Sequence, residues 1–424
     1  MSDQATLWLT AALFTLTYVT LAFGRVPGLR IDRAGIALVG ATLMLVTGVL
    51  SFDQAISPEA IDYKTIALLF GMMVVVGFLR LSGLLRQLTR PALDRIRSPR
   101  CLLAVTIVIS GFLSAFLIND IVCLALTPLV LHLARRLRFD PVPHLIALAT
   151  AANIGSTGTI TGNPQNIYIG SHSGIPYLRF AARLMPVAAL GLVLNFVVIA
   201  LVYRRQLAMP NGAEGGSDDS HFLDHTQSEG RFRVLQWKSG IVALAAVALF
   251  FTGLPLELVA LGAAAVLLLS RIKPQQIYRQ IDWSLLVMFI GLFIVVHAFQ
   301  LRVVSRWGVE NWDGLLSRRP VGLLSLVTTL LSNLVSNVPA VLLMEPVLKA
   351  LPAISRETAW VALAMSSTLA GNLTVVGSVA NLIVLENGDR EGVRVSFWEY
   401  CKVGVPLTIL TLALGIAWLE FVHY

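Results

Sequence analysis

Charged residues are scarce in this chain, and their scarcity defines its class. Asp, Glu, Lys and Arg make up 13% of the 424 residues, whereas hydrophobic residues make up 56% and the mean hydropathy is +0.77. A soluble domain carries about 25% charged residues. Many apolar stretches reach the roughly 20 residues that a helix needs to cross a bilayer. The sequence therefore predicts an all-α, polytopic membrane protein whose main surroundings are lipid.

Cysteine is also rare. The three cysteines, Cys101, Cys123 and Cys401, are far apart and lie in or beside apolar segments. This pattern excludes a disulfide framework and disfavours a metal site. The chain has no glycine-rich ATP-binding loop and no His-Glu-x-x-His motif. We therefore expect no catalytic residues, no metal and no cofactor, so that an ion gradient, or an ATPase on another chain, would have to supply any driving force.

The formal charge of +8 does not indicate a nucleic-acid partner, because Lys and Arg gather in the cytoplasmic loops of polytopic proteins. Arg25, Arg30 and Arg33 follow the first apolar segment (5–23), so this loop is predicted to be cytoplasmic and the N-terminus outside. No Lys or Arg precedes Arg25, so the segment lacks the basic start of a signal peptide and is expected to be retained. Further spans are predicted at 34–50 and 66–84, in the cell (inner) membrane.

Residues 101–136 are predicted to form a re-entrant helical hairpin. Arginines flank this apolar stretch on both sides, so both of its ends belong in the cytoplasm. One crossing cannot satisfy both ends, and the stretch is too short for two. We expect the hairpin to turn at Asn119 and Asp120.

The next apolar segment, 143–170, is predicted to be a broken helix. Its residues 153–166 are rich in amides, hydroxyls and glycines, and Gly155, Gly158, Gly162 and Pro164 make a continuous helix unfavourable. Irregular backbone at membrane depth survives only where protein or a water-filled cavity satisfies it. Residues 370–381 have the same character. Two such breaks in corresponding halves are the best sequence pointer to a transporter's substrate site.

The second half of the chain repeats the first. Four ungapped blocks align in order: Asp62 with Asp282, Asn119 with Asn337, Asn166 with Asn381, and Pro186 with Pro406. Each half is predicted to hold an odd number of spans, so the second copy is inverted and the C-terminus is outside. The predicted domains are a first repeat at 1–205, a cytoplasmic linker at 206–235 and a second repeat at 236–424. The second repeat contains a hairpin at 320–350 and a broken helix at 357–385, and the whole chain has about ten spans.

Inverted repeats bring the hairpin tips and the broken helices together near the bilayer midplane. The groups expected to meet there are hydroxyls and amides, with no Lys or Arg among them. Such a set suits a small hydroxylated solute or a partly dehydrated cation better than a multivalent anion. The predicted substrate-binding residues are Asn119, Asn153, Ser156, Thr157, Thr159, Asn163, Asn166, Ser336, Asn337, Ser367, Asn372, Thr374, Ser378 and Asn381.

Asp120 is the predicted proton-coupling residue. A carboxylate in mid-membrane costs about 2.5–3.5 kcal/mol on insertion scales, so it is rare there and usually functional. A carboxyl group at that depth favours its protonated form and can exchange protons. The alternative is that Asp120 only caps the second arm of the hairpin. Its aligned partner is Val338, so the repeats are not chemically equivalent.

Glu345, in the second hairpin, is expected at a solvated interface near the outer end of its arm.

These residues resemble the ion transporter superfamily over nearly the whole chain. Asn119 and Asp120 before Pro128, the run from Gly162 to Asn166, and residues 336–339 and 370–381 look like the corresponding parts of the arsenical pump membrane proteins. The resemblance implies inverted repeats, a substrate site at the hairpin tips, proton antiport, and often an elevator-like movement. Dicarboxylate and sulfate relatives carry Ser-Asn-Thr at both tips, which differs from this chain and disfavours a sodium–dicarboxylate symporter.

The sequence thus predicts a secondary transporter, not an enzyme, that exports arsenite or antimonite as neutral hydroxides in exchange for protons. A sodium–proton antiporter and an inorganic- or organic-anion permease of the same superfamily are the alternatives. A partner ATPase and a homodimer both stay open.

Overall fold

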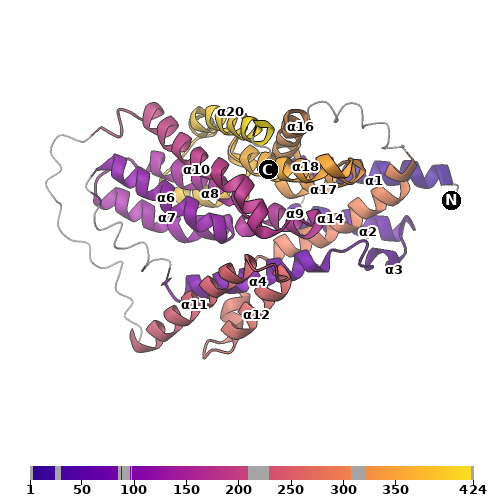
Figure 1. The fold of residues 1–424 in the computed structure, drawn as a ribbon, viewed down its shortest axis with the longest axis horizontal. Coiled ribbons are helices and arrows are strands. Elements are labelled where there is room, and N and C mark those ends of the chain that lie inside the picture. Colours follow the sequence, from indigo (N-terminus) through magenta and orange to yellow (C-terminus); the bar gives the residue numbers. More distant parts are fainter. Residues whose placement is uncertain are drawn as a thin grey trace.

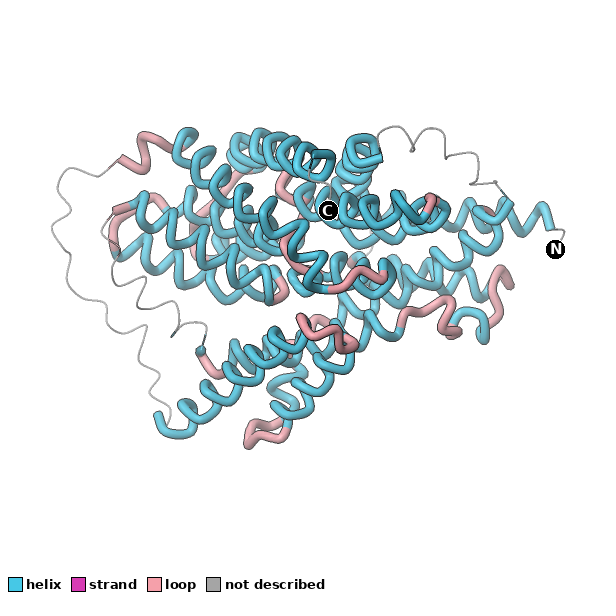
Figure 2. Tube along the Cα trace, in the orientation of Figure 1, coloured by secondary structure: helices cyan, strands magenta, loops and turns pink. Residues whose placement is uncertain are grey.

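The computed structural model describes residues 3–23, 30–84, 98–208, 229–306 and 320–421, together with residues 87 and 96. Within these residues the chain forms helices joined by short loops (Figures 1 and 2). The first half contains α1 (Asp3–Phe23), α2 (Arg33–Val46), α3 (Phe52–Ala55), α4 (Tyr63–Leu81), α6 (Pro99–Phe116), α7 (Asn119–Arg136), α8 (Pro141–Ser156), η1 (Ile160–Gly162), α9 (Pro164–Ser173) and α10 (Tyr177–Val202). The second half contains α11 (Glu229–Phe250), α12 (Leu256–Leu268), α13 (Pro274–Tyr278), α14 (Trp283–Arg302), η3 (Val304–Arg306), α16 (Pro320–Val335), α17 (Asn337–Ala350), α18 (Ala353–Ala370), η5 (Val375–Gly377), α19 (Val379–Arg390) and α20 (Phe397–Phe421).

Most predicted spans are single helices. Seven of the described helices are long and apolar enough to cross a membrane, namely α1, α4, α6, α10, α11, α14 and α20. Two shorter apolar helices, α2 and α12, also occupy predicted spans, at 34–50 and at about 256–269. The predicted linker is shorter at its C-terminal end, because α11 already begins at Glu229. Residues 209–228 of that linker lie outside the described part of the chain.

The two predicted hairpins are the pairs α6–α7 and α16–α17. Leu117 and Ile118 connect the first pair, so the turn precedes Asn119, which begins the second arm. Ile118 occupies the N-cap position of α7, and no side chain caps that helix. The alternative role of Asp120, as the cap of this arm, is therefore wrong. In the second pair a single residue, Ser336, makes the turn with a φ of 77°.

Packing follows the alignment of the two repeats. In the first helix group, α2 packs against α14 and α4 packs against α12, while α1 and α11 pack alongside. These pairs depend on Gly71 and Gly291, which align with each other in the block that begins at Asp62 and Asp282. A Cβ atom on Gly71 would lie 2.7 Å from the backbone of Ala260, and one on Gly291 would lie 2.7 Å from the backbone of Ala37. The same close approach of two helices therefore occurs once in each half.

The second helix group contains both hairpins and both broken helices. Here α6 packs against α8, α16 against α18, α7 against α19 and α10 against α20. The two groups meet mainly where α9 touches α4, α17 touches α14 and α16 touches α1. In Figure 1 the helices α4, α11 and α12 lie apart from α6, α7, α8 and α10, below them in that view.

Gly155 allows the first hairpin to approach the first broken helix. A Cβ atom at this position would overlap the backbone of Gly111 in α6. We expect Gly155→Ala to lower the free energy of unfolding by about 3 kcal/mol, the upper end for overpacked cores, because backbone atoms cannot rotate aside. Thermal unfolding in detergent checks this. Gly262→Ala is the control, because no atom lies within 4 Å of the added Cβ, and equal melting temperatures for the two variants would contradict the prediction.

Candidate functional site

The first broken helix satisfies the backbone groups that its break exposes. Helix α8 ends at Ser156, and α9 begins at Pro164 with Asn163 as its N-cap. The Asn163 side-chain oxygen accepts from the Asn166 backbone N–H at 2.9 Å. The Asn166 amide donates to the carbonyl oxygens of Ser156 at 3.1 Å and Thr159 at 3.0 Å. Two predicted binding residues therefore also support the local backbone.

The second broken helix repeats this arrangement. Helix α18 ends at Ala370, and the Ser378 hydroxyl caps α19 by accepting from the Ala380 N–H at 3.2 Å. The Asn381 amide donates to the carbonyl oxygens of Gly371 at 2.7 Å and Thr374 at 3.1 Å. Asn166 and Asn381, which align in the sequence, therefore perform the same structural task in the two repeats.

Asn153 joins the first hairpin to both broken helices. Its side-chain oxygen accepts from the Asn119 amide and from the Ser378 hydroxyl, each at 3.0 Å. Its nitrogen donates to the side-chain oxygens of Asn372 at 2.9 Å and Asn381 at 3.0 Å. All five side chains are buried. The structure thus brings together residues from the first hairpin tip, the first break and the second break.

Thr368 is a second junction, on α18. Its hydroxyl accepts from the Asn163 amide at 3.1 Å and from the Gln165 amide at 3.2 Å, and lies 3.4 Å from the Asn166 side-chain oxygen. Gln165 is absent from the predicted binding set, although it lies in the run from Gly162 to Asn166 that carries the family resemblance. Its position inside that motif is the signal that could have identified it.

The second hairpin tip reaches the first break through Asn337. With its amide nitrogen directed at the carbonyl oxygens of Ser367 and Gly377, Asn337 donates to them at 3.1 and 3.2 Å. Its oxygen then accepts from Gln165 at 3.3 Å. Ser336 makes no capping bond to α17. The tips of both hairpins therefore lie against the broken helices, as the repeat alignment predicts.

Several predicted hydroxyl groups bond mainly to backbone. Ser156 and Thr157 donate to the Asn153 carbonyl oxygen at 2.8 and 3.2 Å, and Thr159 donates to Ala115 of the first hairpin. Ser367 donates to Ala364 at 3.2 Å. Hydroxyl oxygens retain acceptor capacity after donating, so these groups can still contribute oxygen atoms to a solute.

Thr374 is bonded to Asn333, a residue that is not among the predicted binding residues. Its hydroxyl donates to Asn333 of α16 at 3.2 Å, and Asn333 in turn donates to the Ala370 carbonyl oxygen at 3.0 Å. Asn333 therefore holds the second hairpin against the second break.

Polar atoms without partners remain at the first hairpin tip. The side-chain oxygen of Asn119 is buried and has no hydrogen-bond partner. The side chain of Asp120, the next residue, is half-buried and forms none of the side-chain hydrogen bonds or ion pairs found among the described residues. Buried polar groups normally find partners, so free acceptor oxygens at this tip are available to a solute or a proton.

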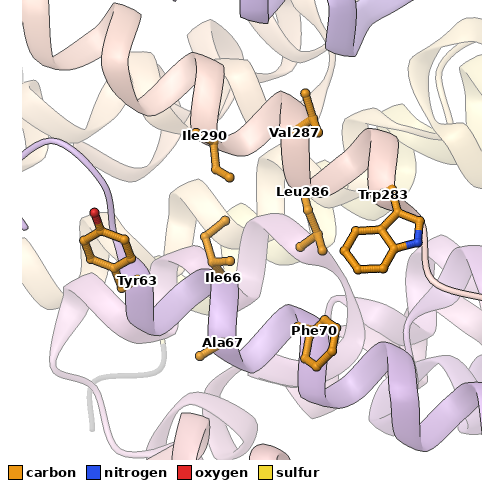
Figure 3. A pocket seen from close by; sticks show the side chains of 8 residues that line it. All are labelled: Tyr63, Ile66, Ala67, Phe70, Trp283, Leu286, Val287 and Ile290. Atoms are coloured by element: carbon orange, nitrogen blue, oxygen red, sulfur yellow. The ribbon is translucent and has the colours of Figure 1, made fainter. Parts of the chain in front are cut away.

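A separate apolar pocket lies outside this polar site (Figure 3). It lies between α4 and α14, and its lining residues align in pairs between the repeats: Tyr63 with Trp283, Ile66 with Leu286, Ala67 with Val287, and Phe70 with Ile290. Its polar atoms are already bonded. The Tyr63 hydroxyl donates to the Ile56 carbonyl oxygen at 2.5 Å, and the Trp283 indole donates to Tyr278 at 3.0 Å. The pocket offers no free hydrogen-bonding groups to a polar solute.

Similarity to known proteins agrees with the arrangement of hairpins and breaks. Residues 18–370 match the sequence profile described as "Citrate transporter". The chain belongs to the citrate transporter (CitMHS) family. This confirms the resemblance to the ion transporter superfamily.

Relatives extend over nearly the full chain. The silicon efflux transporter LSI3 of Oryza sativa subsp. japonica is 31% identical over 95% of each chain. The putative transporter arsB of Dictyostelium discoideum is 26% identical over 92% of this chain and 87% of its own. The crystal structure of the YdaH transporter of Alcanivorax borkumensis superimposes with a TM-score of 0.57 at 15% identity, covering 99% of this chain and 98% of its own. This likeness shows a common fold.

Metal ligands do not gather in the structure. No group of three or more His, Cys, Asp or Glu side chains is placed to hold an ion within the described ranges. Cys123, near the first hairpin tip, is a buried free thiol, and Cys101 and Cys401 are also free.

Proposed function

We propose that this transporter exports small uncharged hydroxides, arsenite or antimonite first among them, in exchange for protons. The observation that carries the proposal is the chemistry of the central network. Its members supply amide and hydroxyl groups from both hairpins and both breaks, and none of the hydrogen bonds joining them involves Lys or Arg. Uncharged donors and acceptors can replace the hydration of a neutral hydroxide without a countercharge.

The same chemistry disfavours citrate. A tricarboxylate deep in the membrane would need cationic partners, because transfer of an unpaired charge from water is very costly. Arsenious acid and silicic acid are both uncharged at neutral pH, and each presents several hydroxyl groups. Two relatives bear names that refer to silicon efflux and to arsB. These names support neutral hydroxides as the substrate class, with silicic acid as the second candidate.

The network also provides a means of binding. In the structure, Asn163 and Gln165 both donate to Thr368, and Gln165 also reaches Asn337. A trihydroxide that enters between these groups would accept from the amides and donate to Thr368 and to the free oxygen of Asn119. It would exchange hydrogen bonds without leaving any buried amide unpaired, which keeps the cost of opening the network low.

Asp120 is the proposed link to the proton gradient. It adjoins Asn119, whose amide donates to Asn153 at the centre of the network. Protonation removes a negative charge beside that hydrogen bond, whereas release of the proton restores it. Binding of the proton and of the solute therefore influence the same group of amides, and inward proton flow can drive outward solute movement. No ATPase is needed for such an exchange.

Growth of a sensitive host tests the substrate. Cells that lack their own arsenite efflux system should tolerate several-fold more arsenite and antimonite when they produce this protein, because export lowers the internal concentration. Cells carrying the Asp120→Asn variant, which should fold but not couple export to protons, serve as the control for expression in the membrane. Protection against neither solute, together with saturable transport of citrate or sodium by the same cells, would contradict the proposal.

A further inference from the structure

A cluster of ionisable side chains joins three helices and shares no member with the central amide network. It consists of Asp62 before α4, Tyr168 and His172 on α9, and Glu345 and Lys349 on α17. His172 stands in the middle. Its Nδ1 lies 3.4 Å from an Asp62 carboxylate oxygen, and its Nε2 lies 3.8 Å from a Glu345 carboxylate oxygen.

The imidazole of His172 is surrounded by acceptors. Nδ1 faces the Tyr168 carbonyl oxygen at 3.1 Å as well as Asp62, and Nε2 faces Glu345. A neutral imidazole donates from one nitrogen only and presents a lone pair on the other. In either tautomer that lone pair would point at an oxygen acceptor. Only the doubly protonated imidazolium carries an N–H on each nitrogen, so only that form can donate toward the acceptors on both sides of the ring.

Both carboxylates are held in place by other groups. Glu345 accepts from the Tyr168 hydroxyl and from the Lys349 ammonium, the latter at 2.6 Å. Its side chain is only 6% exposed, so the expectation of a solvated position for Glu345 is wrong. Asp62 accepts from the hydroxyl of Thr65 on α4. Neither carboxylate can therefore turn away from the imidazole without losing other bonds.

Within the described parts of the chain, the other helices that contact this cluster do so through uncharged groups. Tyr18 of α1 donates to the Pro339 carbonyl oxygen at the start of α17, at 3.2 Å. Phe293 of α14 packs against the ring of Tyr168. With His172 protonated, two positive groups balance the two carboxylates. Without that proton, one carboxylate charge is unbalanced in a largely buried place, which is costly.

The cluster crosses the boundary between the two helix groups. Asp62 belongs to α4, which packs against α12 in the first group, whereas α9 and α17 belong to the second group with α18. The cluster also has no counterpart at the aligned positions of the other repeat. The aligned positions in the other repeat are Asp282, Asn387 and Thr127, which could not reproduce the carboxylate–imidazole–carboxylate arrangement. Alternating access moves one part of a repeat protein against the other, and a movement along this boundary would separate these charges.

We propose that His172 is a second proton-binding site, which latches α9 and α17 to α4 while it is protonated and releases them when it loses the proton. The inference goes beyond the exported solute, because it concerns the movement and not the central amides. The latch makes one of the two arrangements of the helix groups dependent on pH, at a site separate from Asp120.

Paired spin labels test the latch without any solute. We would place them at Lys64→Cys on α4 and Glu386→Cys on α19, both exposed, with Cys101 and Cys401 replaced by serine. Double electron–electron resonance on the purified protein should show one distance population at low pH and a second population as the pH rises. In His172→Gln the distances should no longer depend on pH. His297→Gln, a histidine on α14 outside the cluster, should retain the dependence.

Two further variants test whether the charges around His172 determine the pH response. Glu345→Gln removes a negative charge beside His172, so the midpoint of the transition should fall by about one pH unit. Lys349→Met removes a positive charge, so the midpoint should rise by a similar amount. A pH response that persists unchanged in His172→Gln, or that shifts the same way in both charge variants, would overturn the latch. Because these measurements need no transport, they fail or succeed independently of the proposed function.

Discussion

Proton-driven accumulation of arsenite in everted membrane vesicles is expected to fall to the background level when Asp120 is replaced by asparagine. Asparagine keeps the size and the hydrogen-bonding capacity of the side chain but cannot bind and release a proton. Among the residues that the structure describes, the Asp120 carboxyl group has no ion-pair partner that the substitution would remove, and α7 does not depend on it for a cap. The loss should therefore concern coupling and not folding.

A second assay separates coupling from binding. Vesicles preloaded with arsenite should still exchange it for labelled arsenite in the Asp120→Asn variant, because this exchange needs the amides but no net proton movement. Asp120→Glu, which retains a carboxyl group, should recover part of the driven uptake. Driven uptake by Asp120→Asn at the wild-type rate would remove Asp120 from the mechanism.

Asn153→Ala is expected to abolish both driven uptake and exchange, and to lower the free energy of unfolding by about 2–4 kcal/mol. Asn153 makes side-chain hydrogen bonds to Asn119, Asn372, Asn381 and Ser378. Interhelical hydrogen bonds in membranes contribute about 0.6–2 kcal/mol each, and buried groups left without a partner cost more. Melting temperature in detergent and arsenite exchange measure the two effects.

Asn387→Ala is the matched control for Asn153→Ala. Asn387 also lies on a broken helix, but its amide donates to Ile383 of the same helix at 2.9 Å. We expect this variant to keep its transport and nearly all of its stability. If Asn153→Ala behaves like Asn387→Ala, the central network does not hold the hairpin and the breaks together.

The sequence was sufficient to predict the elements that meet at the centre. Glycine and proline disfavour a continuous helix at 153–166 and at 370–381, and the alignment of the repeats places these breaks opposite each other. The structure has Asn153 bonded directly to Asn372 and Asn381. The aligned glycines Gly71 and Gly291 likewise mark equivalent helix contacts. The alignment of the two repeats therefore predicts contacts between segments that are far apart in the sequence.

The roles of individual amides could not be predicted from the pattern. Asn166 and Asn381 mainly donate to backbone carbonyl groups freed by the breaks. The sequence shows that an asparagine is present, but not whether its amide bonds to the backbone or to a solute. Gln165 was missed because its partners, Thr368 and Asn337, lie about half a chain away.

The environment of Glu345 was predicted wrongly for a related reason. The position of this residue near the end of a hairpin arm suggested exposure to solvent. Its burial depends on Tyr168 and His172, which arrive from a helix in the other repeat. A charge on one helix is interpretable only when the groups that neutralise it are known, and those come from packing.

Reconstitution of the purified protein into liposomes tests the central claim most directly. No ATPase is present, the interior is made acidic, and labelled arsenite is supplied outside. The account predicts accumulation of arsenite above its external concentration, discharge of that accumulation when the pH gradient is collapsed, and stimulation by an interior-positive potential, because exchange of a neutral solute for a proton moves charge. Uptake that only equilibrates, or that follows a sodium gradient and ignores the pH gradient, would contradict it.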